Sequence, residues 1–249
     1  PAAPQESLAG VNRHNVASSH NGQHCGEEDG ESCQSVSPVF GDTFGDTISK
    51  KESSTLRLGF QNIGGFPIDK GKRKEEIIRQ GITKWEFDIF GCAETNVDWR
   101  KVPEEHKLFF RTKEWWDSLH ISGAHNCAMK PTTTRQFGGT AIFSILKASH
   151  RVVEKGCDET KLGRWTWTRY RGKNNQTLRV ISGYRPNPPA GPFTVYAQQN
   201  AYFHSIGKPQ CPRKAFVQDL SAAIRTFLET GDHIILMLDG NSNMKHSDL

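Results

Sequence analysis

Four apolar runs of this chain each end in a side chain that can bind a metal, orient a phosphate or move a proton. These runs end at Asn62, at Glu94, at Tyr184 and at the pair Asp239 and Asn241. Helical patterns separate the first run from the second and the third from the fourth, and such alternation is typical of a layered α/β fold. If the strands lie in packed sheets and run the same way, their ends meet at one edge. The pattern therefore predicts an α/β protein with a site at that edge.

The single elements follow from the spacing of apolar residues. Leu56, Leu58 and Phe60 alternate toward Asn62, which is the period of a half-buried strand. A short amphipathic helix is expected around Ile77 to Ile82, and a longer one from Phe216 to Leu228. Further strands are expected at 86–94, 137–145 and 233–239, together with a hairpin that turns at Asn174-Asn175. Between them, the Pro- and Gln-rich stretch 187–212 reads as a loop too long to be an idle connection.

The first 54 residues differ in composition from the rest. They are rich in Ser, Gly, Glu, Gln, His and Asn and hold few large apolar side chains, so 1–54 is predicted to be a disordered leader and 55–249 the folded domain. His20, His24, Cys25 and Cys33 are candidate zinc ligands there, but their spacing is irregular. The leader has no basic and apolar segments of a signal peptide, and no run is long enough to span a membrane. We expect a soluble intracellular protein without a membrane partner, with the nucleus among the candidate compartments.

The stretch IILMLDGNSN, 234–243, allows three interpretations. Asp239, Asn241 and Asn243 fill the first ligand positions of a calcium loop, but Met244 stands where that loop needs glycine and a strand precedes it. Side chains two apart on an extended chain point to the same side, so Asp239 and Asn241 can instead face one ligand. A turn rich in Asp, Gly and Asn that merely closes a strand is the third alternative.

The ordered motifs FQNIGG, FDIFGCAET, FGGTAIFS, ISGYRP and MLDGNSN resemble the endonuclease/exonuclease/phosphatase superfamily. The resemblance covers about 55–249 and is nearest to the endonuclease domains of non-LTR retrotransposons and to the AP endonucleases. It implies the deoxyribonuclease I-like fold, which is a four-layered α/β sandwich. It also implies a magnesium-dependent DNA endonuclease, with Mn²⁺ as an alternative metal.

The resemblance also assigns roles to residues of this chain. Glu94 is similar to the principal magnesium ligand of the family, and Asn62 to the amide beside the metal. Tyr184 matches the position that contacts the scissile phosphate. Asp239 would orient or deprotonate the attacking water, and Asn241 would hold the phosphate or Asp239 in place. We add Arg185, next to Tyr184, as a candidate phosphate contact.

The C-terminal end departs from the family pattern. The family closes with a Ser-Asp-His motif whose histidine is catalytic, whereas here HSDL follows Asn241 almost at once. We therefore expect a domain that lacks its last strands, and a polypeptide that by itself has weak or no activity. A phosphatase or phospholipase of the same fold, and a catalytically inactive nucleic-acid-binding relic, are the alternative functions. No protein partner can be inferred.

Charge and aromatic residues add to the expectation of a nucleic-acid substrate. The formal net charge of +5 permits a polyanionic partner. Basic residues cluster at Lys70 to Lys74, at Arg100-Lys101 and at Arg169 to Lys173, where they would attract a phosphate backbone. Trp115, Trp116, Trp165 and Trp167 are candidates either for stacking on bases or for the core.

Overall fold

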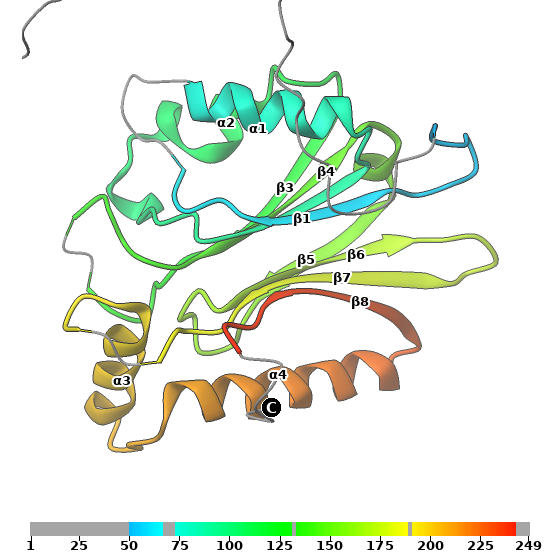
Figure 1. Ribbon diagram of the computed structural model, residues 1–249. Coiled ribbons are helices and arrows are strands. Elements are labelled where there is room, and N and C mark those ends of the chain that lie inside the picture. The colour runs from blue at the N-terminus through cyan, green and yellow to red at the C-terminus, as the bar shows by residue number, and fades with distance from the viewer. Residues whose placement is uncertain (1–49, 67–72, 131–132, 189–190, 243–249) are drawn as a thin grey trace, which may run out of the picture. The chain divides into compact units, whose positions relative to one another are not determined.

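The computed structural model describes residues 50–66, 73–130, 133–188 and 191–242 (Figure 1). The four candidate zinc ligands and most of the predicted leader lie outside these residues. Of the leader, residues 50–54 are described, and there Lys51 forms an ion pair with Asp88 at 2.7 Å. Within the described ranges, no helix combines the length and the apolar character needed to cross a membrane.

In the part of the chain that the structure describes, eight strands form two four-stranded sheets, each a mixture of parallel and antiparallel pairs. The first sheet has the order β1-β2-β4-β3, with β1 at Leu58–Asn62, β2 at Ile89–Ala93, β3 at Leu119–Ala124 and β4 at Thr140–Ile145. The second has the order β5-β6-β7-β8, with β5 at Val152–Cys157, β6 at Trp165–Arg171, β7 at Thr177–Tyr184 and β8 at Asp232–Asp239. Only β1 with β2 and β7 with β8 are parallel among these pairs, so each sheet contains one β-α-β unit.

Helices cover the outer faces of both sheets (Figure 1). The α-helices are α1 at Arg73–Lys84, α2 at Leu108–Thr112, α3 at Val195–Ser205 and α4 at Pro212–Glu229. Short 3₁₀ helices occur at Trp99–Lys101, Glu104–His106 and Leu146–Arg151. Helices α1 and α4 connect the parallel strand pairs and pack on opposite sides of the paired sheets. The result is the predicted four-layered α/β sandwich.

Alternation along the strands separates the core into layers. In β2, Ile89 faces the second sheet, whereas Phe90 packs with Ile78 and Ile82 of α1. In β7, Val180 faces the first sheet, whereas Ile181 packs against Phe216 and Leu220 of α4. In β2 and β7, residues on both faces are buried because each of these strands lies between a helix and the opposite sheet.

Pairs of buried hydroxyl groups satisfy each other between the two sheets. Ser122 Oγ lies 2.7 Å from Thr168 Oγ1, and Ser144 Oγ lies 2.6 Å from the Tyr170 hydroxyl. A buried hydroxyl without a partner costs free energy, so these contacts favour one alignment of the sheets. Ser182 Oγ of β7 donates to the Cys92 carbonyl of β2 at 3.1 Å and adds a third connection.

The hairpin prediction is confirmed and the loop prediction needs a correction. Asn174 and Asn175 both have positive φ, 52° and 58°, and they form the centre of a turn that a hydrogen bond of 3.0 Å closes from the Gln176 N–H to the Lys173 carbonyl. This turn lies in the connection 172–176 between β6 and β7. The stretch 187–212, read from sequence as a loop, contains α3. This helix buries Val195, Gln199 and Phe203 at spacings of four, and the polar Gln199 interrupts the apolar pattern that would have indicated it.

Candidate active site at the strand ends

The two parallel strand pairs deliver their C-terminal ends to the same rim of the sandwich. Asn62 is paired with Ala93, directly before Glu94, and Tyr184 is paired with Asp239. A hydrogen bond of 2.7 Å from Asn62 Nδ2 to Asp239 Oδ2 connects the two sheets at this rim. The side chains that follow or end four strands therefore lie at one rim. Asn62 and Asp239, which this hydrogen bond joins, are 177 positions apart in the chain.

Neighbouring backbone sets the orientation of the Asn62 amide. Its Oδ1 accepts a hydrogen bond from the Gly64 N–H at 2.9 Å, and only the oxygen of the amide can accept one. The amide nitrogen is therefore the atom that faces Asp239. Because a carbonyl oxygen has two lone pairs, Oδ1 retains the capacity to accept or coordinate once more.

Glu94 and Asn241 both adopt left-handed backbone conformations, with φ of 55° and 45°. Such a conformation costs about 1 kcal/mol or more for a residue with a side chain and is concentrated at functional sites. Hydrogen bonds hold each residue in place. The Gly65 N–H donates to the Glu94 carbonyl at 2.7 Å, and Asn241 Nδ2 donates to the Arg185 carbonyl at 2.7 Å.

Tyr184 lies between the two carboxylates and is only 4 % exposed. Burial raises the pKa of its hydroxyl, and the nearby negative charges of Glu94 and Asp239 raise it further. The phenol therefore stays protonated around neutral pH, and its hydroxyl can donate to the Glu94 carboxylate. Asn187 Nδ2 also reaches the Tyr184 hydroxyl, at 3.4 Å. As a neutral donor near both acids, the Tyr184 hydroxyl can orient the Glu94 carboxylate.

Arg185 lies behind the rim. It is 4 % exposed, and its guanidinium donates to Ser242 Oγ. Its backbone N–H donates to the Asp239 carbonyl at 3.0 Å. These contacts tie the end of β7 to the residues after β8. The expected phosphate contact stays a prediction.

Arg213, at the start of α4, is a residue that the sequence analysis missed. Its guanidinium donates to the Pro186 carbonyl at 2.6 Å and to the Asn241 carbonyl at 3.0 Å. It therefore clamps the two segments that carry Tyr184 and Asn241. A lone arginine at the start of a helix gives no sequence signal for this role, because the two carbonyls come from distant segments.

The donor set at the rim fits a hard cation that retains part of its water shell. Within the described ranges, no group of three or more His, Cys, Asp or Glu side chains could hold a metal ion. Magnesium usually binds through one or two carboxylates and several waters. Glu94 and Asp239 supply two carboxylates within electrostatic reach of one hydroxyl, and Asn62 supplies an amide oxygen. This set of oxygen atoms is chemically suited to Mg²⁺ or Mn²⁺.

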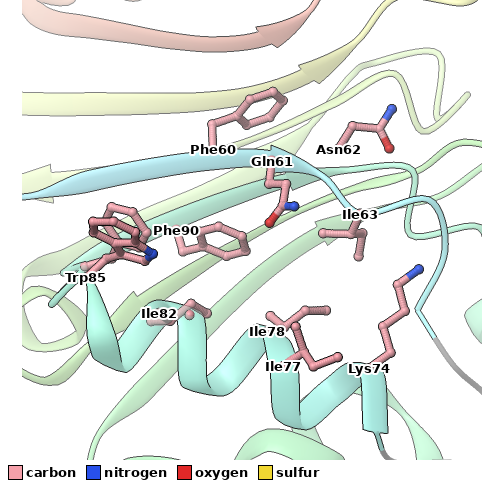
Figure 2. A pocket seen from close by; sticks show the side chains of 12 residues that line it. Phe60, Gln61, Asn62, Ile63, Lys74, Ile77, Ile78, Ile82, Trp85 and Phe90 are labelled. Carbon is pink, nitrogen blue, oxygen red and sulfur yellow. The ribbon is translucent and has the colours of Figure 1, made fainter. Parts of the chain in front are cut away.

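Asn62 also borders a pocket of about 310 Å³ between β1 and α1. Figure 2 shows Ile77, Ile78 and Ile82 of α1 facing β1, with the Lys74 side chain on the same helix near Asn62. The walls are largely apolar, and Gln61, Asn62 and Lys74 contribute polar groups to the lining. The pocket adds a cation beside the rim, since Lys74 Nζ lies near Gly64.

In two of the basic clusters predicted to attract phosphate, the arginines pair with buried aspartates or lie away from the rim. Arg100 pairs with the buried Asp98 at 2.8 Å and donates to three backbone carbonyls, so its charge is used internally. Arg169 pairs with Asp232 at 2.8 Å. Arg171 and Lys173 lie by the hairpin turn before β7, which is the opposite end of that strand from Tyr184. Of the third cluster, Lys70 and Lys72 lie outside the described residues.

The tryptophans proposed for base stacking pack in or against the core. Trp165 is 3 % exposed and meets Phe216 edge to face. Trp167 packs against Phe227, with the Arg179 guanidinium 4.0 Å from its ring centre. Trp115 is stacked on Phe143, and Trp116 packs beside it. Core packing is therefore the role that the structure gives to these four side chains.

No protein-family model matches this chain, and no curated protein matches it. Similar solved structures include the 3′ phosphatase NExo from Neisseria bound to a product DNA hairpin, at 14% identity, with 75% of this chain and 58% of that chain covered and a TM-score of 0.47. The human Nocturnin catalytic domain with a bound sulfate anion is 12% identical, with 73% and 63% covered and a TM-score of 0.44. An AP endonuclease from Archaeoglobus fulgidus is 18% identical, with 61% and 49% covered and a TM-score of 0.36. The chain spans less than two thirds of the length of each.

Proposed function

We propose that this chain carries the site of a metal-dependent phosphodiesterase, specifically a DNA endonuclease domain of retroelement origin. The observation that supports this most is the hydrogen bond from Asn62 to Asp239, which places the ends of both sheets around the Tyr184 hydroxyl. Two carboxylates, two amides and a neutral phenol at one rim are suited to binding a cation and a phosphodiester.

In this proposal Glu94 would be the main ligand of Mg²⁺, and Asn62 Oδ1 would be available as a further oxygen donor. Mn²⁺, which also favours carboxylate and carbonyl oxygens, could take the same place. The bound cation would supply charge stabilisation to the phosphate oxygens as negative charge develops on the leaving group. The other side chains act on water and phosphate.

Asp239 is positioned to orient a water or to take its proton. Its carboxylate accepts from Asn62 Nδ2, and the Asn241 N–H approaches Oδ1 at 3.4 Å. These donors orient the carboxylate without neutralising it, which a general base requires. Asn241 keeps the segment in place through the Arg185 carbonyl, and Tyr184 donates to Glu94 or to a phosphate oxygen.

The test is nicking of supercoiled plasmid with the chain in excess, in Mg²⁺ and in EDTA. We expect slow nicking that depends on the metal and is lost in Glu94→Ala and in Asp239→Ala. Glu105→Ala and Asp117→Ala are matched controls, since both remove an exposed carboxylate outside the rim. These controls should nick like the unaltered chain.

A second readout separates binding from catalysis. Mn²⁺ binding, followed by electron paramagnetic resonance, should weaken at least tenfold in Glu94→Ala and remain unchanged in Glu105→Ala. Nicking that is equal in all variants, or Mn²⁺ binding that ignores Glu94, would overturn the proposal. Salt-dependent DNA binding without metal binding or cleavage would support the inactive nucleic-acid-binding relic instead.

A further inference from the structure

Two phenylalanines near the rim are exposed to solvent, whereas large apolar side chains are usually buried in the core. Phe193 is 77 % exposed, the highest value among the large apolar side chains that the structure describes, and Phe137 is 40 % exposed. Neither belongs to a core cluster of the described residues. An exposed aromatic ring beside a candidate site is a candidate for ligand contact.

Hydrogen bonds hold Phe137 close to Glu94. The next residue, Gly138, accepts from the Asn96 N–H at 2.8 Å, and its own N–H donates to Asn96 Oδ1 at 2.7 Å. The Thr95 N–H donates to the Gly139 carbonyl at 3.2 Å. The segment that carries Phe137 is therefore fixed to the residues that directly follow Glu94.

Phe193 is anchored to the same place from the other side. Val195, two residues later, packs in a cluster with Ala93 and Tyr184. The Val195 side chain also lies against Gly138, where an added Cβ would come within 3.1 Å of Val195 Cγ2. Phe137 and Phe193 thus flank one contact, between Gly138 and Val195, that borders the proposed active site.

A cation accompanies this pair of rings. The Arg135 guanidinium carbon lies 5.1 Å from the Phe137 ring centre, within the range of a cation–π interaction. A surface that combines exposed rings with a guanidinium can stack on the faces of bases and attract the phosphates between them. Stacked duplex bases present no free faces, so such a surface favours unpaired nucleotides.

We propose that Phe137, Phe193 and Arg135 form a platform that binds unpaired nucleotides next to the scissile phosphate. This inference rests on the proposed function and narrows its substrate class to single-stranded DNA, or to DNA with unpaired bases at the cleavage point. A protein ligand would be the other use of exposed phenylalanines. The nearby guanidinium and the oxygen-rich rim favour the nucleotide.

The experiment measures binding of the chain to fluorescein-labelled single-stranded and duplex oligonucleotides of the same sequence, by anisotropy in EDTA. We expect the single strand to bind tighter than the duplex. Phe137→Ala and Phe193→Ala should each weaken single-strand binding by about 5- to 100-fold, the range expected for the loss of one stacked base. Phe193→Trp should retain binding, since a larger ring can still stack.

Phe109→Ala is the matched control, because Phe109 is 48 % exposed on α2 and is not among the residues that hold the rim. It should bind as the unaltered chain does. The platform is overturned if both alanine variants bind single strands normally, or if duplex binds as tightly as single strand. EDTA keeps this result separate from catalysis. Aromatic-dependent binding without Glu94-dependent metal binding would support the platform and overturn the proposed hydrolase.

Discussion

Asn62 donates a hydrogen bond of 2.7 Å to Asp239, which belongs to the other sheet. A negative charge introduced at position 62 should therefore repel the Asp239 carboxylate. Asn62→Asp would set two carboxylates at hydrogen-bond distance with no proton between them. In EDTA we expect the melting temperature to fall by several degrees. Mg²⁺ or Mn²⁺ should raise it more in the variant than in the unaltered chain, because a cation relieves the repulsion.

Gln61→Glu is the control for that experiment. Gln61 is the exposed neighbour on β1, and successive side chains of a strand point to opposite faces. The control adds the same charge without placing it against Asp239, so its response to metal should match that of the unaltered chain. If Asn62→Asp also responds to metal like the unaltered chain, no cation binds between these residues.

The hydroxyl of Tyr184 should ionise only at strongly alkaline pH. Burial and then the charges of Glu94 and Asp239 raise its pKa above the ordinary value of 10.0. A raised pKa means that the group contributes stability below about pH 10, which is lost as pH rises further. In an absorbance titration of the folded protein, Tyr184→Phe should therefore leave the tyrosinate signal up to about pH 11 unchanged.

Denatured protein provides the comparison for this titration. There, Tyr184→Phe should remove one quarter of the tyrosinate signal, because the chain contains four tyrosines. A loss of the same size in the folded protein near pH 10 would show that Tyr184 is accessible and that the carboxylates do not lie beside it.

Arg213 should affect catalysis more than stability. Arg213→Ala removes both hydrogen bonds that join the Pro186 and Asn241 carbonyls. We expect nicking to slow about tenfold, which corresponds to about 1.4 kcal/mol in the barrier. Arg213→Lys should be intermediate, since an ammonium lacks the planar fork of a guanidinium.

Lys214→Ala serves as the control for this prediction, because Lys214 is the exposed neighbour on α4. It removes one positive charge without touching either carbonyl. Equal slowing in Lys214→Ala and Arg213→Ala would show that charge near the rim matters and that the clamp does not.

Asp232, at the start of β8, should stabilise the fold and take no part in catalysis, because it lies at the opposite end of β8 from Asp239. Its buried carboxylate accepts from Arg169 Nε at 2.8 Å and from Arg179 Nε at 2.7 Å. Asp232→Asn removes the nearer counter-charge of the buried Arg179 and leaves only the longer ion pair with Glu154 at 3.7 Å, so we expect the free energy of unfolding at pH 7 to fall by about 3 kcal/mol. Asp117→Asn, on an exposed carboxylate, should change it by less than about 0.5 kcal/mol.

The effect of Asp232→Asn should depend on pH in one direction. Burial alone would raise the pKa of Asp232, but hydrogen bonds from Thr177, Arg179 and Arg169 outweigh it and lower the pKa below 3.8. A lowered pKa gives stability that is present above about pH 4 and is lost as pH falls through the folded-state value. Chemical denaturation from pH 7 to pH 3 should show the variant and the unaltered chain converging at the acid end.

Local elements could be predicted from sequence because their signals are local. The alternation of apolar residues indicated β1, a continuous apolar run indicated β8, and Asn174-Asn175 indicated the hairpin because both positions need positive φ. Helix α3 was missed because Gln199 occupies a buried position on its inner face. The strands β3 and β5 were also not predicted, and several of their residues are exposed.

The apolar patterns of the chain specify which strands end in acids, amides or a tyrosine, and therefore which functional groups are present. It could not determine that Asn62 lies against Asp239, because that contact depends on how two sheets pack and on the register of Tyr184 with Asp239. Only the packing of the chain shows that Arg100 and Arg169 form ion pairs with the buried Asp98 and Asp232. The same holds for Arg213, which joins the carbonyls of Pro186 and Asn241 at the rim. Periodicity along a chain encodes which face of an element is buried, whereas meetings between distant elements depend on the packing of the whole core.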